Sequence, residues 1–143
     1  MTAPAHDTNA SPLAVQGIDN ILFTVGDLDA AVDHYGVRLG LPLVFRLDNR
    51  RLALFRLGDE PPGLLVRESA EAGPPTPDNA RPRVWLEVAD ARAAAAELAQ
   101  RGLSPVGDPF TVATGWTVEI ADPWGNVVGF TDYTRMPERA RRR

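Results

Sequence analysis

An internal repeat restricts the folds open to this chain. Residues 20–44 read NILFTVGDLDAAVDHYGVRLGLPLV, and residues 83–106 read RVWLEVADARAAAAELAQRGLSPV. Each segment begins with a short alternating apolar run, continues with an Asp and a helical pattern, and has a Gly before a second apolar run. Aligning Asp27 with Asp90 gives an offset of 63 residues. The repeat therefore predicts two copies of one structural unit in a single chain.

In each copy the alternation predicts a strand, and the Asp predicts the N-cap of a helix. The apolar residues of the two strands share one face because the side-chain period of a strand is two. They are Ile21, Phe23 and Val25 in the first copy and Val84, Leu86 and Val88 in the second. The apolar stripes of the two helices are Leu28, Ala31, Val32 and Tyr35, and Ala91, Ala94, Ala95 and Leu98. Gly40 and Gly102 are expected to end these helices.

Three further strands are predicted after each helix. In the first copy they are 43–47, 51–57 and 64–67, and in the second they are 105–110, 117–121 and 127–132. The segment DPWGN, residues 122–126, is a strong turn signal between the last two strands. The order β-α-β-β-β in each copy predicts an α+β fold. Two tandem βαβββ modules would form a cupped, mostly antiparallel eight-stranded sheet with the helices on its outer face.

The polar and mixed alternates of the first strands would then face the inside of the cup. These residues are Asn20, Thr24, Arg83, Trp85 and Glu87. The domain boundaries follow from the same pattern and from Pro and Gly content. We expect a disordered leader at 1–16, modules at 17–69 and 83–134, a linker at 70–82 and a basic tail at 135–143.

Composition narrows the class of partner. The net charge is −4, and without residues 135–143 ten Arg face eighteen acidic residues, which is a poor match to nucleic acid. There is no Cys, so thiolate metal sites and disulfides are excluded. No apolar run is long enough to span a membrane, and the first residues are a poor signal peptide. We therefore expect a cytoplasmic protein with a small-molecule ligand, and neither nucleic acid nor membrane as a partner.

The repeated units, their order and the DPWGN turn together resemble the vicinal oxygen chelate superfamily, which includes glyoxalase I, extradiol dioxygenases and bleomycin-resistance proteins. The resemblance covers nearly everything from Ile18 to Tyr133. It implies paired βαβββ modules, ligand sites in the sheet cups and, commonly, dimers. We accordingly expect a two-fold homodimer.

The resemblance also implies metal-ligand positions, and here the chain departs from the family. The positions seven residues before each strand-end Asp hold Asn20 and Arg83, and the last-strand position of the second module holds Gly129. The matching position of the first module is Leu65 or Val66. Arg cannot ligate a cation and Gly has no side chain, so we expect no metal and no cofactor. His34, one residue off the helical stripe, is expected at the surface.

Two functions of different class remain open. The first is a protein that binds and sequesters a planar or aromatic natural product, as in antibiotic resistance. Its ligand-binding residues would be Asn20, Thr24, Arg83, Trp85, Glu87, Trp116, Glu119 and Gly129, with Trp116 in a loop at the rim of the cup. Trp85 and Trp116 can equally be core residues. The second is an enzyme of the same superfamily, a lyase, isomerase, epimerase or dioxygenase, that acts on a small oxygenated substrate. A metal-free lyase or isomerase would use Glu87 or Glu119 as general base. Either Glu can instead be a strand carboxylate paired with Arg.

Overall fold

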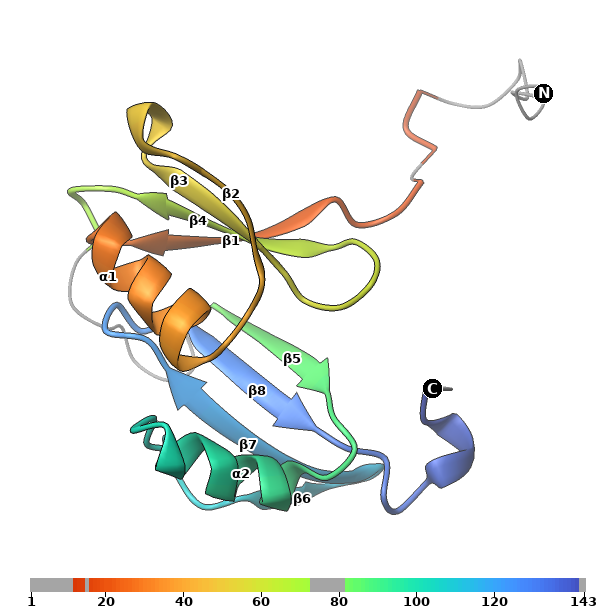
Figure 1. Cartoon of the computed structure of the whole chain (residues 1–143). Helices are drawn as coiled ribbons and strands as arrows, with labels where there is room; N and C mark the ends of the chain where they lie inside the picture. The colour runs from red at the N-terminus through yellow and green to blue at the C-terminus, as the bar shows by residue number, and fades with distance from the viewer. Residues whose placement is uncertain (1–11, 15, 73–81, 142–143) are drawn as a thin grey trace.

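The computed structural model describes residues 12–14, 16–72 and 82–141, and it contains two βαβββ modules (Figure 1). Most of the predicted linker (70–82) and most of the predicted leader (1–16) lie outside the described residues. In the first module β1 (Asn20–Val25) leads into α1 (Leu28–Val32), which continues as a π-helical turn, η1 (Asp33–Arg38). The remaining elements are β2 (Leu43–Leu47), η2 (Asp48–Arg50), β3 (Leu52–Arg56) and β4 (Gly63–Glu68).

The second module repeats this order. Its elements are β5 (Arg83–Glu87), α2 (Ala91–Gln100), β6 (Phe110–Val112), β7 (Gly115–Ala121) and β8 (Val127–Thr131), followed by a short 3-10 turn, η4 (Pro137–Arg139). The strand predicted at 105–110 forms only in part. Pro105 makes an isolated bridge with Ile120, and the ladder of β6 starts at Phe110. Pro105 and Pro109 lack the N–H that a continuous ladder requires, which explains the difference.

Each module forms one four-stranded sheet with the same topology. The strand orders are β1-β4-β3-β2 and β5-β8-β7-β6, with the first pair of each sheet parallel and the other pairs antiparallel. Within the described residues every ladder stays inside its own module, so the eight strands are divided between two sheets. The predicted α+β fold with tandem modules and helices packed on the sheets is confirmed.

The N-terminus of each helix is held by two carboxylates. Asp27 accepts a hydrogen bond from the Ala30 N–H at 2.8 Å, and Asp90 accepts one from the Ala93 N–H at 3.0 Å, as an N-cap Asp does. A second carboxylate comes from the end of the last strand of each module. Glu68 accepts from Leu28 N–H at 2.8 Å, and Asp132 accepts from Ala91 N–H at 2.7 Å. The repeat therefore extends to the way each helix is fixed to its sheet.

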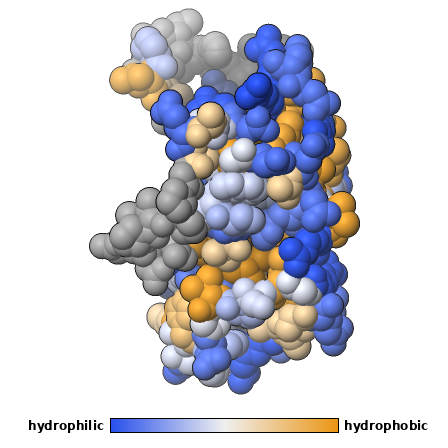
Figure 2. Space-filling model, turned by 90° about the vertical axis from the view of Figure 1, so that its left-hand side faces the viewer, coloured by the Kyte–Doolittle hydropathy of each residue, from blue (hydrophilic) through white to orange (hydrophobic). Residues whose placement is uncertain are grey.

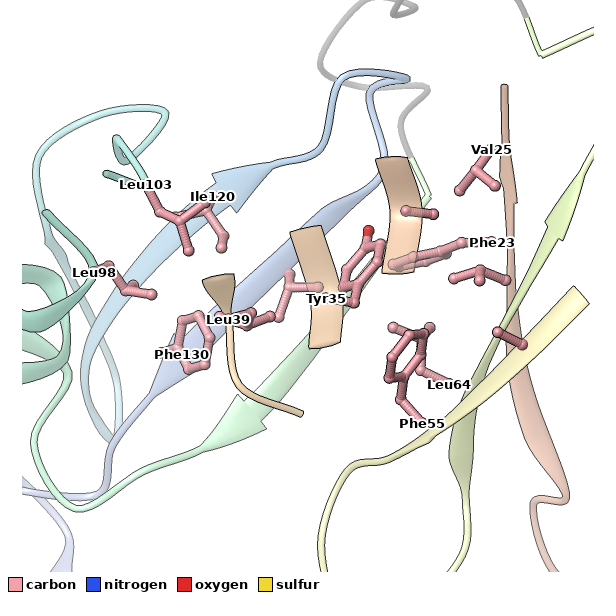
Figure 3. Packing of buried hydrophobic residues seen from close by; sticks show 14 of the residues in the cluster. Phe23, Val25, Tyr35, Leu39, Phe55, Leu64, Leu98, Leu103, Ile120 and Phe130 are labelled. Atoms are coloured by element: carbon pink, nitrogen blue, oxygen red, sulfur yellow. The ribbon is translucent and has the colours of Figure 1, made fainter. Parts of the chain in front are cut away.

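One apolar core runs through both modules (Figure 3). Phe23, Phe55 and Tyr35 are at most 2% exposed and pack around the first helix. Leu39 extends the cluster toward Phe130 in the second module, as Figure 3 shows. Phe23, Phe55 and Phe130 all belong to this buried cluster. Hydrophilic residues cover most of the face seen in Figure 2, with apolar residues mainly at one edge and in its lower half.

The prediction for His34 is wrong, because its side of the first helix faces the second module. His34 is only 6% exposed, and its ring meets Tyr35 edge-on at a centroid distance of 4.6 Å. In η1 the Leu39 N–H bonds to the His34 carbonyl, five residues back, so this turn holds one more residue than an α-helical turn. The extra residue of this turn lies after His34, whereas Asp122 of the second module lies close enough to His34 to act on its charge. Burial lowers the pKa of its imidazole.

Polar contacts fix one module against the other. The Tyr35 hydroxyl donates to Asp122 at 2.7 Å, and the Asn126 amide donates to the Thr24 carbonyl at 2.8 Å. An arginine near the end of each helix makes a hydrogen bond to the end of the other helix. Arg38 donates to the Gly102 carbonyl, and Arg101 donates to the Leu39 carbonyl. The two donors differ by 63 in number, and so do the two acceptors, so this pair of contacts follows the internal repeat. No helix within the described residues is long and apolar enough to cross a membrane.

Candidate functional site

A row of three residues crosses the open face of the second sheet. Trp85 on β5 lies opposite Gly129 on β8, and Gly129 lies opposite Glu119 on β7. The indole Nε1–H of Trp85 donates to Oε2 of Glu119 at 2.8 Å. Arg83, two residues before Trp85 on the same face, donates from Nη1 to both oxygens of Glu119, at 3.0 and 2.8 Å. The indole therefore spans β8 and meets the carboxylate on the far side.

Gly129 makes this arrangement possible. A Cβ built at this position would lie 2.5 Å from Cδ1 and 2.8 Å from Nε1 of Trp85, closer than such atoms approach. The sequence indicated only that Gly129 supplies no metal ligand. The structure adds that the missing side chain is the space in which the indole lies. Trp85, Gly129 and Glu119 are thus one interdependent unit.

Trp85 is not a core residue. It is 42% exposed, and its ring contacts Phe110 at a centroid distance of 6.1 Å and an interplanar angle of 57°. Phe110, itself 40% exposed, had no predicted role because the sequence placed it at the end of a strand without defining its face. Together the two rings present aromatic surface to solvent, and such surface is suited to stacking on a flat molecule.

A cleft of about 700 Å³ lies beside this row, between β5 and the loop formed by residues 57–62. Trp85 and Glu87 line one side of the cleft, and Asp59 and Glu60 are among the residues of the opposite loop. Only 8% of the Glu87 side chain is exposed. Its two oxygens accept from Arg141, one from the guanidinium at 3.0 Å and one from the backbone N–H at 2.9 Å.

Both candidate bases are therefore paired with arginine, which is the simpler of the two interpretations that the sequence left open. Glu119 is bound by Arg83 and Glu87 by Arg141. The involvement of Arg141 had no signal in the sequence beyond the abundance of Arg after residue 134. Its contact with Glu87 spans 54 residues and depends on the path of the chain after β8.

The other predicted site residues lie elsewhere. Asn20 is at the edge of the first sheet, where it accepts from the Gly63 N–H at 3.3 Å and lines a smaller cavity of about 310 Å³. Thr24 is at the end of β1, and its carbonyl is bound by Asn126. The structure thus brings Arg83, Trp85, Glu119 and Gly129 together, places Glu87 in the adjoining cleft, and leaves Asn20 and Thr24 on the other module.

The predicted place of Trp116 in a rim loop is wrong. Trp116 is the second residue of β7, and strand alternation puts it on the same side as Val118, facing the helix layer. The guanidinium of Arg92 on α2 lies 4.4 Å from its ring centroid, a cation–π contact. Trp116 lies two residues before Val118. If the predicted strand had been extended by two residues, alternation would have placed both side chains on the same face.

The residues at the family's metal positions do not fit a divalent ion. Arg83 brings a positive charge that Glu119 already neutralises, and Gly129 lies beneath the indole. The register settles the matching position of the first module as Leu65, which lies opposite Leu22 as Gly129 lies opposite Trp85. Among the described residues no three His, Cys, Asp or Glu side chains gather as a metal site would require.

Comparison with known proteins agrees with this fold. The model of the Glyoxalase/Bleomycin resistance protein/Dioxygenase superfamily matches residues 17–130. No curated protein matches the chain. Among solved structures, a glyoxalase/bleomycin resistance protein/dioxygenase from Nocardioides is 17% identical, with a TM-score of 0.69, and 92% of each chain is covered.

Two other solved structures carry more specific names. An antibiotic binding protein from a Streptomyces species is 22% identical with a TM-score of 0.69, covering 85% of this chain and 99% of that one. A lactoylglutathione lyase from Agrobacterium tumefaciens is 21% identical with a TM-score of 0.61, covering 87% of this chain and 98% of that one. At these identities the likeness shows the fold alone, and it extends to a binder and to an enzyme.

Proposed function

The chain belongs to the glyoxalase/bleomycin resistance protein/dioxygenase superfamily, and we propose that it binds and sequesters a planar small molecule without changing it. The observation that carries the proposal is the exposed indole of Trp85, held across Gly129 by Glu119. A rigid aromatic surface that is oriented before the ligand arrives loses little conformational freedom on binding. The cleft beside it, of about 700 Å³, is within the size range of small-molecule sites.

The alternative is a metal-free lyase or isomerase in which Glu87 or Glu119 takes a proton from the substrate. The cleft position of Glu87 favours this alternative, because a carboxylate that is mostly buried beside a cavity is a common feature of catalytic sites. However, both oxygens of each carboxylate already accept hydrogen bonds from protein donors. A catalytic Glu would therefore have to take the proton on a lone pair that these donors leave open, while it still holds its arginine.

The deciding experiment follows the fate of bound molecules. A panel of planar natural products is screened by quenching of Trp fluorescence, and each binder is incubated with excess protein. Mass spectrometry and chiral chromatography then examine the recovered ligand. Recovery of unchanged ligand is the expected result. A new mass or a new stereoisomer that disappears in Glu87→Gln or Glu119→Gln would identify an enzyme instead.

We propose further that binding needs no metal. The proposal rests on Arg83 and Gly129 at positions where the family's metalloenzymes carry ligands, and on the Arg83–Glu119 ion pair at that place. Elemental analysis of protein purified without chelator should find well below one equivalent of Zn, Ni, Mn or Fe. A stoichiometric metal whose removal abolishes ligand binding would contradict the proposal.

A two-fold homodimer is the proposed assembly. Support comes from the first module, where apolar side chains of β1 and of the edge strand β2 are 39–50% exposed. These residues are Leu22, Leu43, Val44, Phe45 and Leu47. An uncovered apolar sheet edge is a common site of association between chains. Sedimentation at micromolar concentration should give a mass near twice 15.5 kDa, and a mass near 15.5 kDa would count against the dimer.

A further inference from the structure

The chain that follows β8 returns to the cleft and places Arg141 against Glu87. The contact uses both the guanidinium and the backbone N–H of Arg141, so that each oxygen of Glu87 accepts one hydrogen bond. The two partners differ greatly in exposure. The side chain of Glu87 is 8% exposed, whereas that of Arg141 is 81% exposed. A carboxylate deep in the cleft is thus neutralised by a cation that remains mostly in solvent.

This difference makes Arg141 a replaceable partner. Leaving a mostly buried carboxylate without a cation is unfavourable, so Glu87 requires a positive charge close to it. An ion pair to an exposed Arg, however, is only weakly stabilising. Another cation of similar shape can therefore take the place of Arg141 at little cost, provided that it gains further contacts in the cleft.

The remaining walls of the cleft offer such contacts to a cation. Trp85 lines the cleft, and the face of an indole attracts a positive charge. Asp59 and Glu60 stand on the opposite loop, and neither is in an ion pair within the described part of the chain. A flat molecule with a protonated amine or guanidine group would combine stacking on the indole with a salt bridge to Glu87.

We propose that Arg141 stands in for a cationic group of the ligand, so that the ligand and Arg141 compete for Glu87. The proposal rests on the proposed function, because it places the cationic group of the same ligand beside Trp85. It assigns the ligand to a chemical class, that of planar aromatic cations. The segment after β8 then acts as an internal competitor that weakens binding while Arg141 is in place.

The size of the effect follows from competition. The apparent dissociation constant is the intrinsic constant divided by the fraction of molecules in which Glu87 is free. The ion pair between Arg141 and Glu87 is weak but formed in most molecules. Its removal should therefore improve the affinity for a cation roughly 3- to 10-fold. A neutral ligand of the same shape gains nothing from Glu87, so its affinity should change by less than about twofold.

The test compares two tricyclic probes, proflavine as the planar cation and acridone as its neutral counterpart, by calorimetric titration. Arg141→Gln removes the competing charge, and the matched control Arg139→Gln removes a charge from the same exposed segment. Proflavine should bind Arg141→Gln roughly 3- to 10-fold more tightly than it binds the wild type, with acridone nearly unchanged. The control should leave both affinities within about twofold. In a Glu87→Gln background, Arg141→Gln should have no further effect.

Three results would overturn the proposal. They are an unchanged or weaker proflavine affinity in Arg141→Gln, an equal gain for acridone, and the absence of proflavine binding to every variant. Trp85→Ala separates this proposal from the proposed function. If Trp85→Ala binds both probes as the wild type does, the indole is not the ligand platform. A gain for proflavine in Arg141→Gln would then still support competition at Glu87.

Discussion

The two ends of the contact between the modules have opposite characters, although the internal repeat relates them. At one end the loop after β7, residues 122–126, is fixed to the first module by Asp122 and Asn126. At the other end the loop after β3, residues 57–62, stands across a cleft of about 700 Å³ from β5. Equivalent loops thus close one junction and leave the other open.

The difference lies in a few side chains. The closed loop begins with Asp122 and ends with Asn126, and both make hydrogen bonds to the first module. In the open loop, Asp59 is at the position equivalent to Asp122 but makes no such hydrogen bond within the described residues, and Gly63 takes the place of Asn126. Tyr35, the partner of Asp122, corresponds in the second helix to Leu98, which has no hydroxyl. A duplicated fold can therefore keep a cleft at one junction where the polar contacts that close the other junction are absent.

The two sheet faces differ in the same way. The row Trp85–Gly129–Glu119 in the second sheet corresponds by register to Leu22–Leu65–Leu54 in the first. Three leucine side chains form an apolar surface without polar groups that could orient a ligand. A Trp, a Gly and a Glu on the same backbone fix an indole in one orientation beside a charged pair.

The largest expected effect is on the closed junction. Asp122 is 5% exposed, and it accepts from the Tyr35 hydroxyl, from the Asn126 amide and from two backbone N–H groups. Asp122→Ala leaves these donors without a partner and should lower the free energy of unfolding by about 3 kcal/mol, measured by urea denaturation. Asp59→Ala in the exposed open loop should change it by less than about 0.5 kcal/mol. Equal losses would refute the contrast between the two junctions.

The next largest effect concerns the aromatic residues. Trp85→Ala should weaken binding of a planar probe such as acridone by about 1–3 kcal/mol, a roughly 5- to 150-fold change. Trp116→Ala is the matched control, because Trp116 packs under Arg92 on the helix side. Trp116→Ala should leave the affinity for the probe within about twofold of the wild-type value, measured for both variants by the same fluorescence titration. A loss in Trp116→Ala as large as that in Trp85→Ala would show that the ligand lies outside the cleft.

A smaller effect is expected where the two modules are alike. Arg38 and Arg101 make reciprocal contacts with the Gly102 and Leu39 carbonyls. Arg38→Ala and Arg101→Ala should each reduce the free energy of unfolding by about 0.5–1.5 kcal/mol, the range of single hydrogen bonds. Similar losses, measured by urea denaturation, would confirm that this part of the contact is symmetric. A loss confined to one variant would show that the symmetry is only apparent.

The smallest effect is a dependence of stability on pH that comes from one helix only. Burial lowers the pKa of His34 below 6.5, although the nearby Asp122 opposes the shift. The unfolded chain therefore binds a proton at this residue more readily than the folded protein, and stability falls as the pH decreases below about 6.5. His34→Gln should flatten this part of the curve of unfolding free energy against pH. An unchanged slope would exclude His34 as its source.

The second helix provides the reference for this pH effect. Glu97 occupies the equivalent position on the regular helix α2, where it is exposed and pairs with Arg101 at 3.0 Å. His34 lies near Asp122 of the other module, whereas Glu97 is on the exposed side of its helix. A periodicity of 3.6 residues, read along residues 28–38, places His34 outside because it does not include the second module that covers this side of the helix.

Local patterns in the sequence determined most of the fold. Strand alternation, the caps Asp27 and Asp90, and the terminal Gly40 and Gly102 all depend on neighbouring residues, so the repeat alone predicted both modules. Alternation also placed Arg83 and Trp85 on one face. The predictions for Trp116 and His34 were wrong, because the first depended on where β7 begins and the second on how the first helix packs against the second module.

Only the tertiary structure decided how the site is assembled. Glu119 reaches Trp85 because Gly129 leaves space between them. The three residues lie on three neighbouring strands, and the order of strands in a sheet cannot be predicted from a local sequence pattern. Arg141 meets Glu87 across 54 residues, and the cleft lies between β5 and a loop of the other module. Such features depend on register and on the packing of distant segments, whereas a sequence pattern records only the periodicity of neighbouring residues.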